Sequence, residues 1–319
     1  MRPVRWLDMT PEEFIEARAE RPVAYVPFGH AEAHGVVNAL GMDWYCADSF
    51  CVRMAEKYKG IACPGFQYHV DEEPYMNWGI NSCKMGEQFC SGISNSLFLH
   101  NMLYQIRLLD ARKFKAGLLI GGHAVPNLRK DAALLIEYYK MMTGSPIQLE
   151  YLVYLDLDKQ AKKRLFPNER IIDGHAGFVE TALLMAFKPE LAHPELLGTE
   201  ARYPESGGGR EGMFDAYCAP HTFGKNDGQL LPTAERGEML IQAYLESLGK
   251  RADELLSAYD ETDGRPEAPN FDELEGIWAG FYEATFRYWG SHMSYVDYEE
   301  KRPMPVFPGW DFLGIKGRK

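Results

Sequence analysis

Apolar and amphipathic segments alternate along most of this chain of 319 residues. Compact apolar runs with the composition of buried β-strands lie at residues 22–28, 116–120 and 147–157. Stretches with helical spacing of apolar positions lie at residues 44–57, 96–109, 127–142, 177–187 and 232–259. Strands that alternate with helices are typical of a mainly parallel sheet covered by helices on both faces. The pattern therefore predicts an α/β fold.

The chain opens with the signature of a short helix. Thr10 suits an N-cap, Glu13 follows three positions later as in a capping box, and Phe14 and Ile15 supply apolar positions. We therefore expect a helix that begins directly after Thr10.

The composition changes near residue 261, so we expect one large domain over residues 1–260 and an extension over residues 261–319. The extension is crowded with aromatic side chains, and an isolated tail would not expose so many of them. We expect it to pack on its own domain or to cover the site or interface of a neighbouring subunit.

Residues 203–212 (YPESGGGREG) are too rich in glycine for regular structure and predict a mobile surface loop.

The charge and composition of the chain exclude several classes of partner. A formal net charge of -12 at pH 7, with no basic cluster, would repel a nucleic-acid backbone. No apolar run approaches the roughly 20 residues that cross a bilayer, and residues 1–20 are too acidic for a secretion signal. We therefore expect a cytoplasmic protein that binds a small molecule and neither nucleic acid nor membranes. The six cysteines lack zinc-knuckle spacing, so reduced, buried thiols are expected.

The first group of residues with chemical potential follows the predicted strand at residues 22–28. Glu32 and His34 are two positions apart, so in extended chain both side chains point the same way. Asp43 lies at the predicted start of the next helix, from which its carboxylate can return to the same place. This loop therefore supplies three candidate metal ligands.

Two further groups also lie at predicted strand or helix ends. His123 follows Gly121 and Gly122 at the carboxyl end of the strand at residues 116–120, where ligand sites of open α/β sheets gather. His175 is flanked by small residues, and Glu180 occupies the first turn of a predicted helix. Each residue alone fits a structural role, such as a core histidine, a helix cap or a first-turn acid. Their joint occurrence at such ends favours a site.

Two imidazoles (His34 and His123) and three carboxylates (Glu32, Asp43 and Glu180) form a nitrogen and oxygen donor set that suits zinc, manganese or iron. Two divalent ions would share Asp43, and a metal-bound hydroxide could attack a carbonyl polarised by the ions. His175 would relay the proton to the leaving nitrogen. The sequence thus predicts a metal-dependent hydrolase.

These segments together resemble the creatininase (creatinine amidohydrolase) family. The resemblance rests on residues 26–35 (VPFGHAEAHG), Asp43, the GGH at 121–123 and residues 175–181 (HAGFVET). It implies a three-layer α/β/α sandwich, a homo-oligomer that is commonly a hexamer, and a binuclear metal centre that hydrolyses C–N bonds of small, often cyclic amides.

The resemblance also implies the role of each residue. Glu32 and His123 would bind one ion, His34 would bind the other, Asp43 would bridge them, and His175 would be the catalytic acid and base. In creatininase a glutamate two positions after the strand-end histidine binds the second ion, but Val125 stands there in this chain. We assign Glu180 to the vacant place, as a ligand and a candidate catalytic residue.

Other departures from the family pattern concern the substrate. The segment after the GGH differs from the family's Asn-Gly-His-Gly-Gly-Asn, and residues 78–80 replace its usual Pro-Gly-Thr, which argues against creatinine as substrate. His30 stands where the family has a small residue, and residues 69–73 (HVDEE) are unusually acidic, so either could contact the substrate. Two alternatives stay open, a metal-dependent isomerase or lyase acting on a sugar-like substrate and a non-catalytic module braced by metal.

Overall fold

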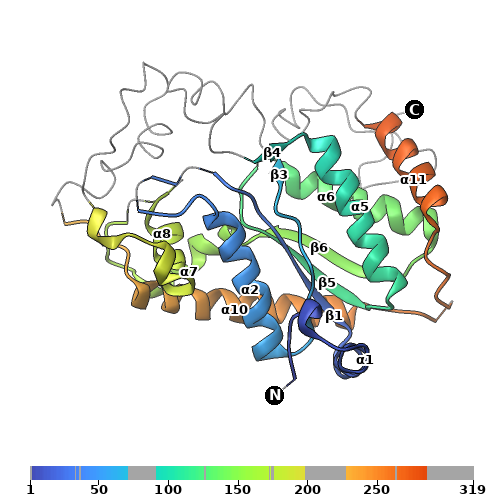
Figure 1. Ribbon diagram of the computed structural model, residues 1–319, viewed down its shortest axis with the longest axis horizontal. Coiled ribbons are helices and arrows are strands. Elements are labelled where there is room, and N and C mark those ends of the chain that lie inside the picture. Colours follow the sequence, from blue (N-terminus) through green and yellow to red (C-terminus); the bar gives the residue numbers. More distant parts are fainter. Residues whose placement is uncertain are drawn as a thin grey trace.

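The computed structural model contains a four-stranded parallel sheet in the order β2-β1-β5-β6 (Figure 1). The structure describes residues 2–32, 34–35, 37–70, 91–125, 127–171, 173, 176–197, 228–262 and 264–285. The strands are β1 (Val23–Phe28), β2 (Ile61–Ala62), β5 (Ala116–Gly121) and β6 (Gln148–Val153), and a separate parallel pair joins β3 (His69–Val70) to β4 (Gly92–Ile93). β1 and β5 pair along their full length and end side by side, with Phe28 opposite Gly121.

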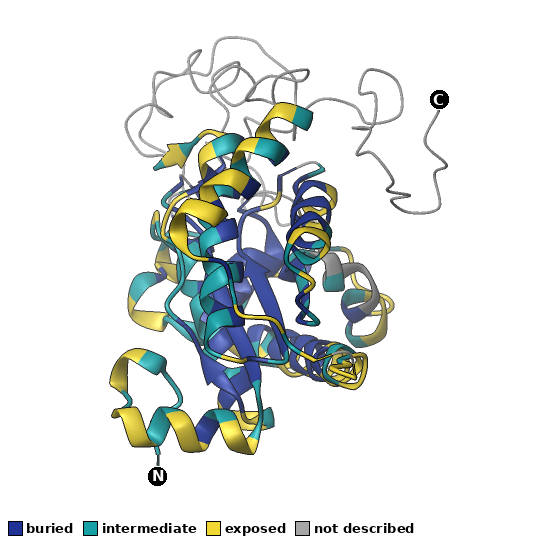
Figure 2. Cartoon of the chain, turned by 90° about the vertical axis from the view of Figure 1, so that its right-hand side faces the viewer, coloured by how far each residue is buried: buried dark blue, intermediate teal, exposed yellow. Residues whose placement is uncertain are grey.

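Helices cover both faces of this sheet, and each face has its own apolar core. One layer contains α2 (Met42–Tyr58), α7 (Asp158–Leu165), α8 (Phe178–Phe187) and α10 (Ala234–Ser257). The other contains α5 (Asn95–Ala111), α6 (Leu128–Thr143) and α11 (Phe271–Ala284). Along β1, Val23 and Tyr25 pack into the first core, whereas Ala24 and Val26 pack into the second. The predicted three-layer α/β/α sandwich is therefore confirmed, and Figure 2 shows its buried sheet between the helices.

The opening helix begins where the sequence predicts. α1 (Pro11–Glu20) follows Thr10, whose hydroxyl accepts a hydrogen bond from the Glu13 amide while the Glu13 carboxylate accepts one from the Thr10 amide. A short 3-10 helix, η1 (Trp6–Asp8), precedes it.

One predicted strand is shorter than expected. The run at residues 147–157 forms β6 only as far as Val153 and continues as the 3-10 helix η2 (Tyr154–Leu157) and then as α7. The cause is the length of the neighbouring strand, because Val153 pairs with Gly121, the last residue of β5. Two more 3-10 helices, η3 (Pro189–Leu191) and η4 (Pro194–Leu196), follow α8.

The first part of the aromatic extension packs on the chain's own helices. Leu274, Ile277 and Phe281 of α11 join the core formed with α5 and α6, and the Trp278 ring stacks on His100 at 4.5 Å between centroids. Residues 286–319 and the predicted loop at residues 203–212 lie outside the described residues, and the domain division at residue 260 stays a prediction. Within the described part of the chain, no helix is both long and apolar enough to cross a membrane.

Candidate metal centre

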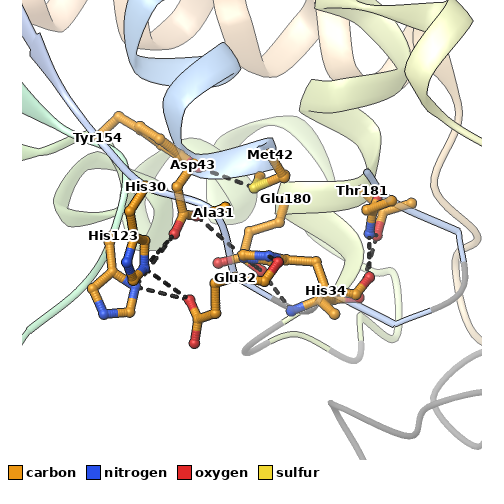
Figure 3. A network of polar contacts seen from close by, with 12 residues as sticks. His30, Ala31, Glu32, His34, Met42, Asp43, His123, Tyr154, Glu180 and Thr181 are labelled. Atoms are coloured by element: carbon orange, nitrogen blue, oxygen red, sulfur yellow. Dashed lines mark hydrogen bonds and ion pairs between the residues drawn. The ribbon is translucent and has the colours of Figure 1, made fainter. Parts of the chain in front are cut away.

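The candidate site lies where β1 and β5 end and where α2 and α8 begin (Figure 3). The loop after β1 supplies His30, Glu32 and His34, and the loop after β5 supplies His123. The first turns of two helices complete the set, with Asp43 in α2 and Glu180 in α8. All six side chains are buried, and His123, the most exposed residue, reaches only 7%.

Glycines allow the two strand ends to lie against the first turn of α2. A Cβ atom on Gly122 would lie 2.0 Å from the Asp43 carbonyl oxygen, and one on Gly29 would lie 2.6 Å from the Trp44 backbone nitrogen. Any side chain at either position would push the helix away. The glycines of the two strand-end motifs therefore place Asp43 between the residues that follow β1 and those that follow β5.

Four side chains converge on one point beside the Oδ2 atom of Asp43. His123 Nδ1 lies 3.0 Å from Glu32 Oε2 and 3.3 Å from Asp43 Oδ2. His30 Nε2 lies 3.5 Å from each of the same two oxygens. One donor atom from each of the four residues lies within 4.8 Å of all the others, so this group could hold a metal ion.

A second group faces the other oxygen of Asp43. His34 Nε2 lies 3.2 Å from Asp43 Oδ1 and 3.8 Å from Glu180 Oε2. The Asp43 carboxylate thus presents one oxygen to each group, which is the arrangement expected of a bridging ligand.

Hydrogen bonds outside the two groups orient His34 and Glu180. His34 Nδ1 lies 3.1 Å from the Glu32 carbonyl oxygen, to which it can donate, and Nε2 on the other side of the ring faces Asp43. Glu180 Oε2 accepts a hydrogen bond of 2.5 Å from the Ala176 amide. The Asn38 side-chain amide donates to the His34 carbonyl oxygen and to the Thr181 hydroxyl, which ties the loop to α8.

The buried carboxylates change the protonation of the groups around them. Burial would lower the pKa of His34, but the charge of Asp43 outweighs burial and raises it to about 10. Burial likewise opposes the shift at His123, where Glu32 and Asp43 hold the pKa well above its usual value. Burial raises the pKa of Glu180 to about 8, and repulsion from Asp43 acts in the same direction although His34 opposes it. In the metal-free protein, protons compensate the negative charge of the carboxylates.

The donors present fit a divalent cation. Among the described residues, only histidines form ion pairs with Glu32, Asp43 and Glu180. Within the same residues, both ring nitrogens of His30 and the Oδ2 atom of Asp43 have no hydrogen-bond partner. Buried polar atoms of this kind are costly unless another group satisfies them. Nitrogen and carboxylate oxygen donors suit zinc or manganese, so the site can accept such an ion.

The structure brings together five of the six residues proposed from the sequence, namely Glu32, His34, Asp43, His123 and Glu180. His175 lies outside the described residues. Val125, the position at which the family resemblance implies a glutamate, packs in the apolar core with α5 and α6.

The sequence reasoning missed the position of two histidines. His30 was expected to affect substrate binding, but it faces the same oxygens as His123. Its two-residue spacing from Glu32 equals that between Glu32 and His34 and could have identified it. His69 of β3 was treated as part of an acidic segment, yet it is fully buried, its Nε2 lies 2.9 Å from the Tyr151 hydroxyl, and its ring lies 5.2 Å from that of His123. No local pattern joins His69 to Tyr151, which lies in another strand.

The fold of the chain is shared with solved creatininase structures. A structure named "Creatininase Mn" is 20% identical, with a TM-score of 0.55 and coverage of 79% of this chain and 98% of that one. A creatinine amidohydrolase (creatininase) is 19% identical, with a TM-score of 0.54 and coverage of 80% and 98%. A creatininase mutant of the Zn-Zn type is 18% identical, with a TM-score of 0.57 and coverage of 80% and 98%.

Two comparisons of the amino-acid sequence complement the comparison of folds. A comparison with curated proteins finds no match. The sequence profile of the family described as Creatininase, creatinine amidohydrolase, matches residues 7–251. That segment extends from η1 into α10 and contains both groups of candidate ligands. The chain therefore belongs to the creatininase family of amidohydrolase-type metal enzymes.

Proposed function

We propose that this protein is a metal-dependent amidohydrolase that cleaves a C–N bond in a small polar amide, cyclic or open, other than creatinine. The observation that carries the proposal is the Asp43 carboxylate, which is buried between two groups of histidines and acids. Membership of the family supports the reaction class. The changed segments beside His123 and at residues 78–80 argue for a different substrate.

The proposed centre holds two divalent ions, zinc, manganese or iron, that share Asp43. Glu32 and His123 serve one ion, and His34 and Glu180 serve the other. Bound ions of this kind act as Lewis acids on a carbonyl oxygen and lower the pKa of water. Glu180 has no neighbouring lysine or arginine among the described ion pairs, which supports its use as the ligand that replaces the acid lost at Val125.

Two side chains of the protein, His175 and Glu180, are the candidates for proton transfer during the reaction. We assign to His175 the transfer of a proton to the leaving nitrogen. In the chain His175 precedes Ala176, whose amide donates to the Glu180 carboxylate, so the two candidate catalytic residues are close along the backbone. Glu180 is the other candidate catalytic residue. Burial raises the pKa of its carboxyl to about 8 in the metal-free protein, so a bound ion would displace its proton.

The setting of the enzyme is also part of the proposal. We propose a cytoplasmic homo-oligomer, a hexamer as the family resemblance implies. Cys46, Cys51 and Cys63 are free and buried, which is consistent with a reducing compartment. The net charge of -12 favours a small-molecule substrate over nucleic acid.

The test combines elemental analysis with a panel of small cyclic and formyl amides. Purified protein is expected to hold about two equivalents of metal and to release ammonia or amine from at least one substrate. The double variant Glu32→Ala, His123→Ala should lose both properties. The control is His100→Ala, Glu275→Ala, which removes a surface His–Glu pair of 3.0 Å and should keep both.

Three other results would contradict the proposal. A carefully reloaded wild type that binds no metal would remove the catalytic centre. A metal-loaded protein that is inert towards the whole panel would favour a non-catalytic module. Turnover without incorporation of oxygen from labelled water would favour an isomerase or lyase.

A further inference from the structure

We propose that His30 is a fourth protein ligand for the ion served by Glu32, Asp43 and His123. We call this ion position the closed position and the other ion position the open position. The closed position would have four protein donors, and the open position only His34, Asp43 and Glu180. This inference rests on the proposed metal centre. It adds a ligand that the family resemblance does not supply, because the resemblance implies a small residue in place of His30.

The spacing of the four donor atoms fits one ion. A tetrahedral zinc site with bonds of about 2.0–2.1 Å has ligand atoms about 3.3–3.4 Å apart. The measured separations from His123 Nδ1 are 3.0 Å to Glu32 Oε2 and 3.3 Å to Asp43 Oδ2. Those from His30 Nε2 are 3.5 Å to both oxygens. His30 is therefore at the same distance from the two carboxylates as a metal ligand would be.

The surroundings of His30 argue against an ordinary core histidine. Its side chain is completely buried, yet neither ring nitrogen has a hydrogen-bond partner among the described residues. The buried His69 nearby has the hydrogen bond expected of a core histidine, since its Nε2 lies 2.9 Å from the Tyr151 hydroxyl. An imidazole left without such a bond in the interior is costly. A metal ion beside Nε2 would remove that cost at this nitrogen.

The ring of His30 also lies close to that of His123, with centroids 4.4 Å apart and an interplanar angle of 53° (Figure 3). Packing against His123 is thus a competing role for His30. The two roles differ in one respect, because packing needs the ring whereas ligation needs the nitrogen.

The difference between the two positions has a functional consequence. Zinc sites with four protein ligands are structural as a rule, and catalytic sites keep a coordination place free. The His30 position would then retain its ion and fix the geometry of Asp43. The position beside His34 and Glu180 has three protein donors and would receive the substrate's carbonyl oxygen.

The experiment titrates metal-free protein with zinc and compares wild type with His30→Gln and His30→Phe. Phe keeps a ring next to His123 but has no donor nitrogen, so it separates packing from ligation. The control is His69→Gln, which removes another buried histidine whose ring lies 5.2 Å from His123. We expect the tighter of two binding steps to weaken at least about 100-fold in both His30 variants, because even indirect ligand partners contribute 10–100-fold. The control should keep wild-type affinity.

X-ray absorption at the zinc edge supplies a readout that does not depend on activity. With one equivalent of zinc, wild type should show two imidazole ligands, and each His30 variant should show one. Melting of the metal-free proteins checks that the variants fold. Unchanged affinity and two imidazoles in both variants would overturn this inference while leaving the proposed function intact. Wild type that binds no zinc would overturn both.

Discussion

Two buried aspartates of this protein have opposite surroundings. Asp110, at the end of α5, accepts hydrogen bonds from the Tyr139 and Ser145 hydroxyls at 2.7 and 2.8 Å and forms an ion pair of 2.7 Å with Arg265. Among the described residues, the ion-pair partners of Asp43 are all histidines, and other acids lie nearby. A permanent cation and fixed donors satisfy Asp110, whereas the charge of Asp43 is balanced by groups that can lose their protons. The first environment stabilises a fold, and the second is suited to binding a cation.

The largest expected effect comes from Asp43→Asn. The amide removes the shared charge, so turnover should fall at least about 1,000-fold, since the loss of even one stabilising donor can cost 100–1,000-fold. Activity within tenfold of wild type would contradict the bridging role.

Asp110→Ala should lower the stability of the fold and leave the metal content unchanged. It leaves Arg265, whose side chain is only 9% exposed, without its partner, so unfolding should cost about 3–5 kcal/mol less than in wild type. Urea denaturation measures the change, and metal analysis of the folded fraction should show wild-type content. A loss of metal without a loss of stability would mean that the two aspartates do not differ as described.

Gly122→Ala tests the close contact that positions Asp43. The new methyl group would meet the Asp43 carbonyl oxygen, and overpacking of this kind destabilises by about 1–3 kcal/mol. Metal affinity should fall with stability. Gly276→Ala in α11 is the matched control, because its Cβ would meet nothing within 4 Å, and it should stabilise by up to about 1 kcal/mol. Thermal melting with and without zinc measures both effects.

The last prediction concerns the pH dependence of stability. With a pKa raised to about 10, His34 stabilises the metal-free fold fully below about 6.5, and this contribution is lost as pH rises towards 10. Glu180, raised to about 8, acts in the same direction between about pH 4.5 and 8. Stability of the metal-free protein should therefore fall from pH 6.5 to 9, by up to about 1.4 kcal/mol per pH unit for each group. Bound metal should flatten or reverse the trend, because ligands bind it without their protons. Urea denaturation at several pH values, with and without zinc, tests this.

The sequence predicted those parts of the fold that depend on local pattern. Apolar runs located β1 and β5, and the glycine-flanked motifs after them located Glu32, His34 and His123. The strand at residues 147–157 was predicted too long because its end depends on the length of β5, which no local pattern reveals.

The contacts that the sequence could not predict join residues that are far apart along the chain. Asp110 and Arg265 are 155 positions apart, and His69 and Tyr151 are 82 apart, so no periodicity connects them. His30 differs, since its spacing from Glu32 carried the signal. The family resemblance directed attention away from it, because the resemblance implies a small residue at that position.

Gly29 and Gly122 contact the first turn of α2, so the backbone that positions the site is distinct from the side chains that supply its donor atoms. Backbone atoms fix the position of Asp43, and the remaining donors project from loops and from α8 onto that fixed point. Donor side chains can consequently be exchanged without redirecting the main chain. For protein engineering, the metal preference of the proposed centre is open to redesign by substitutions at the donor positions, provided that the two glycines are retained.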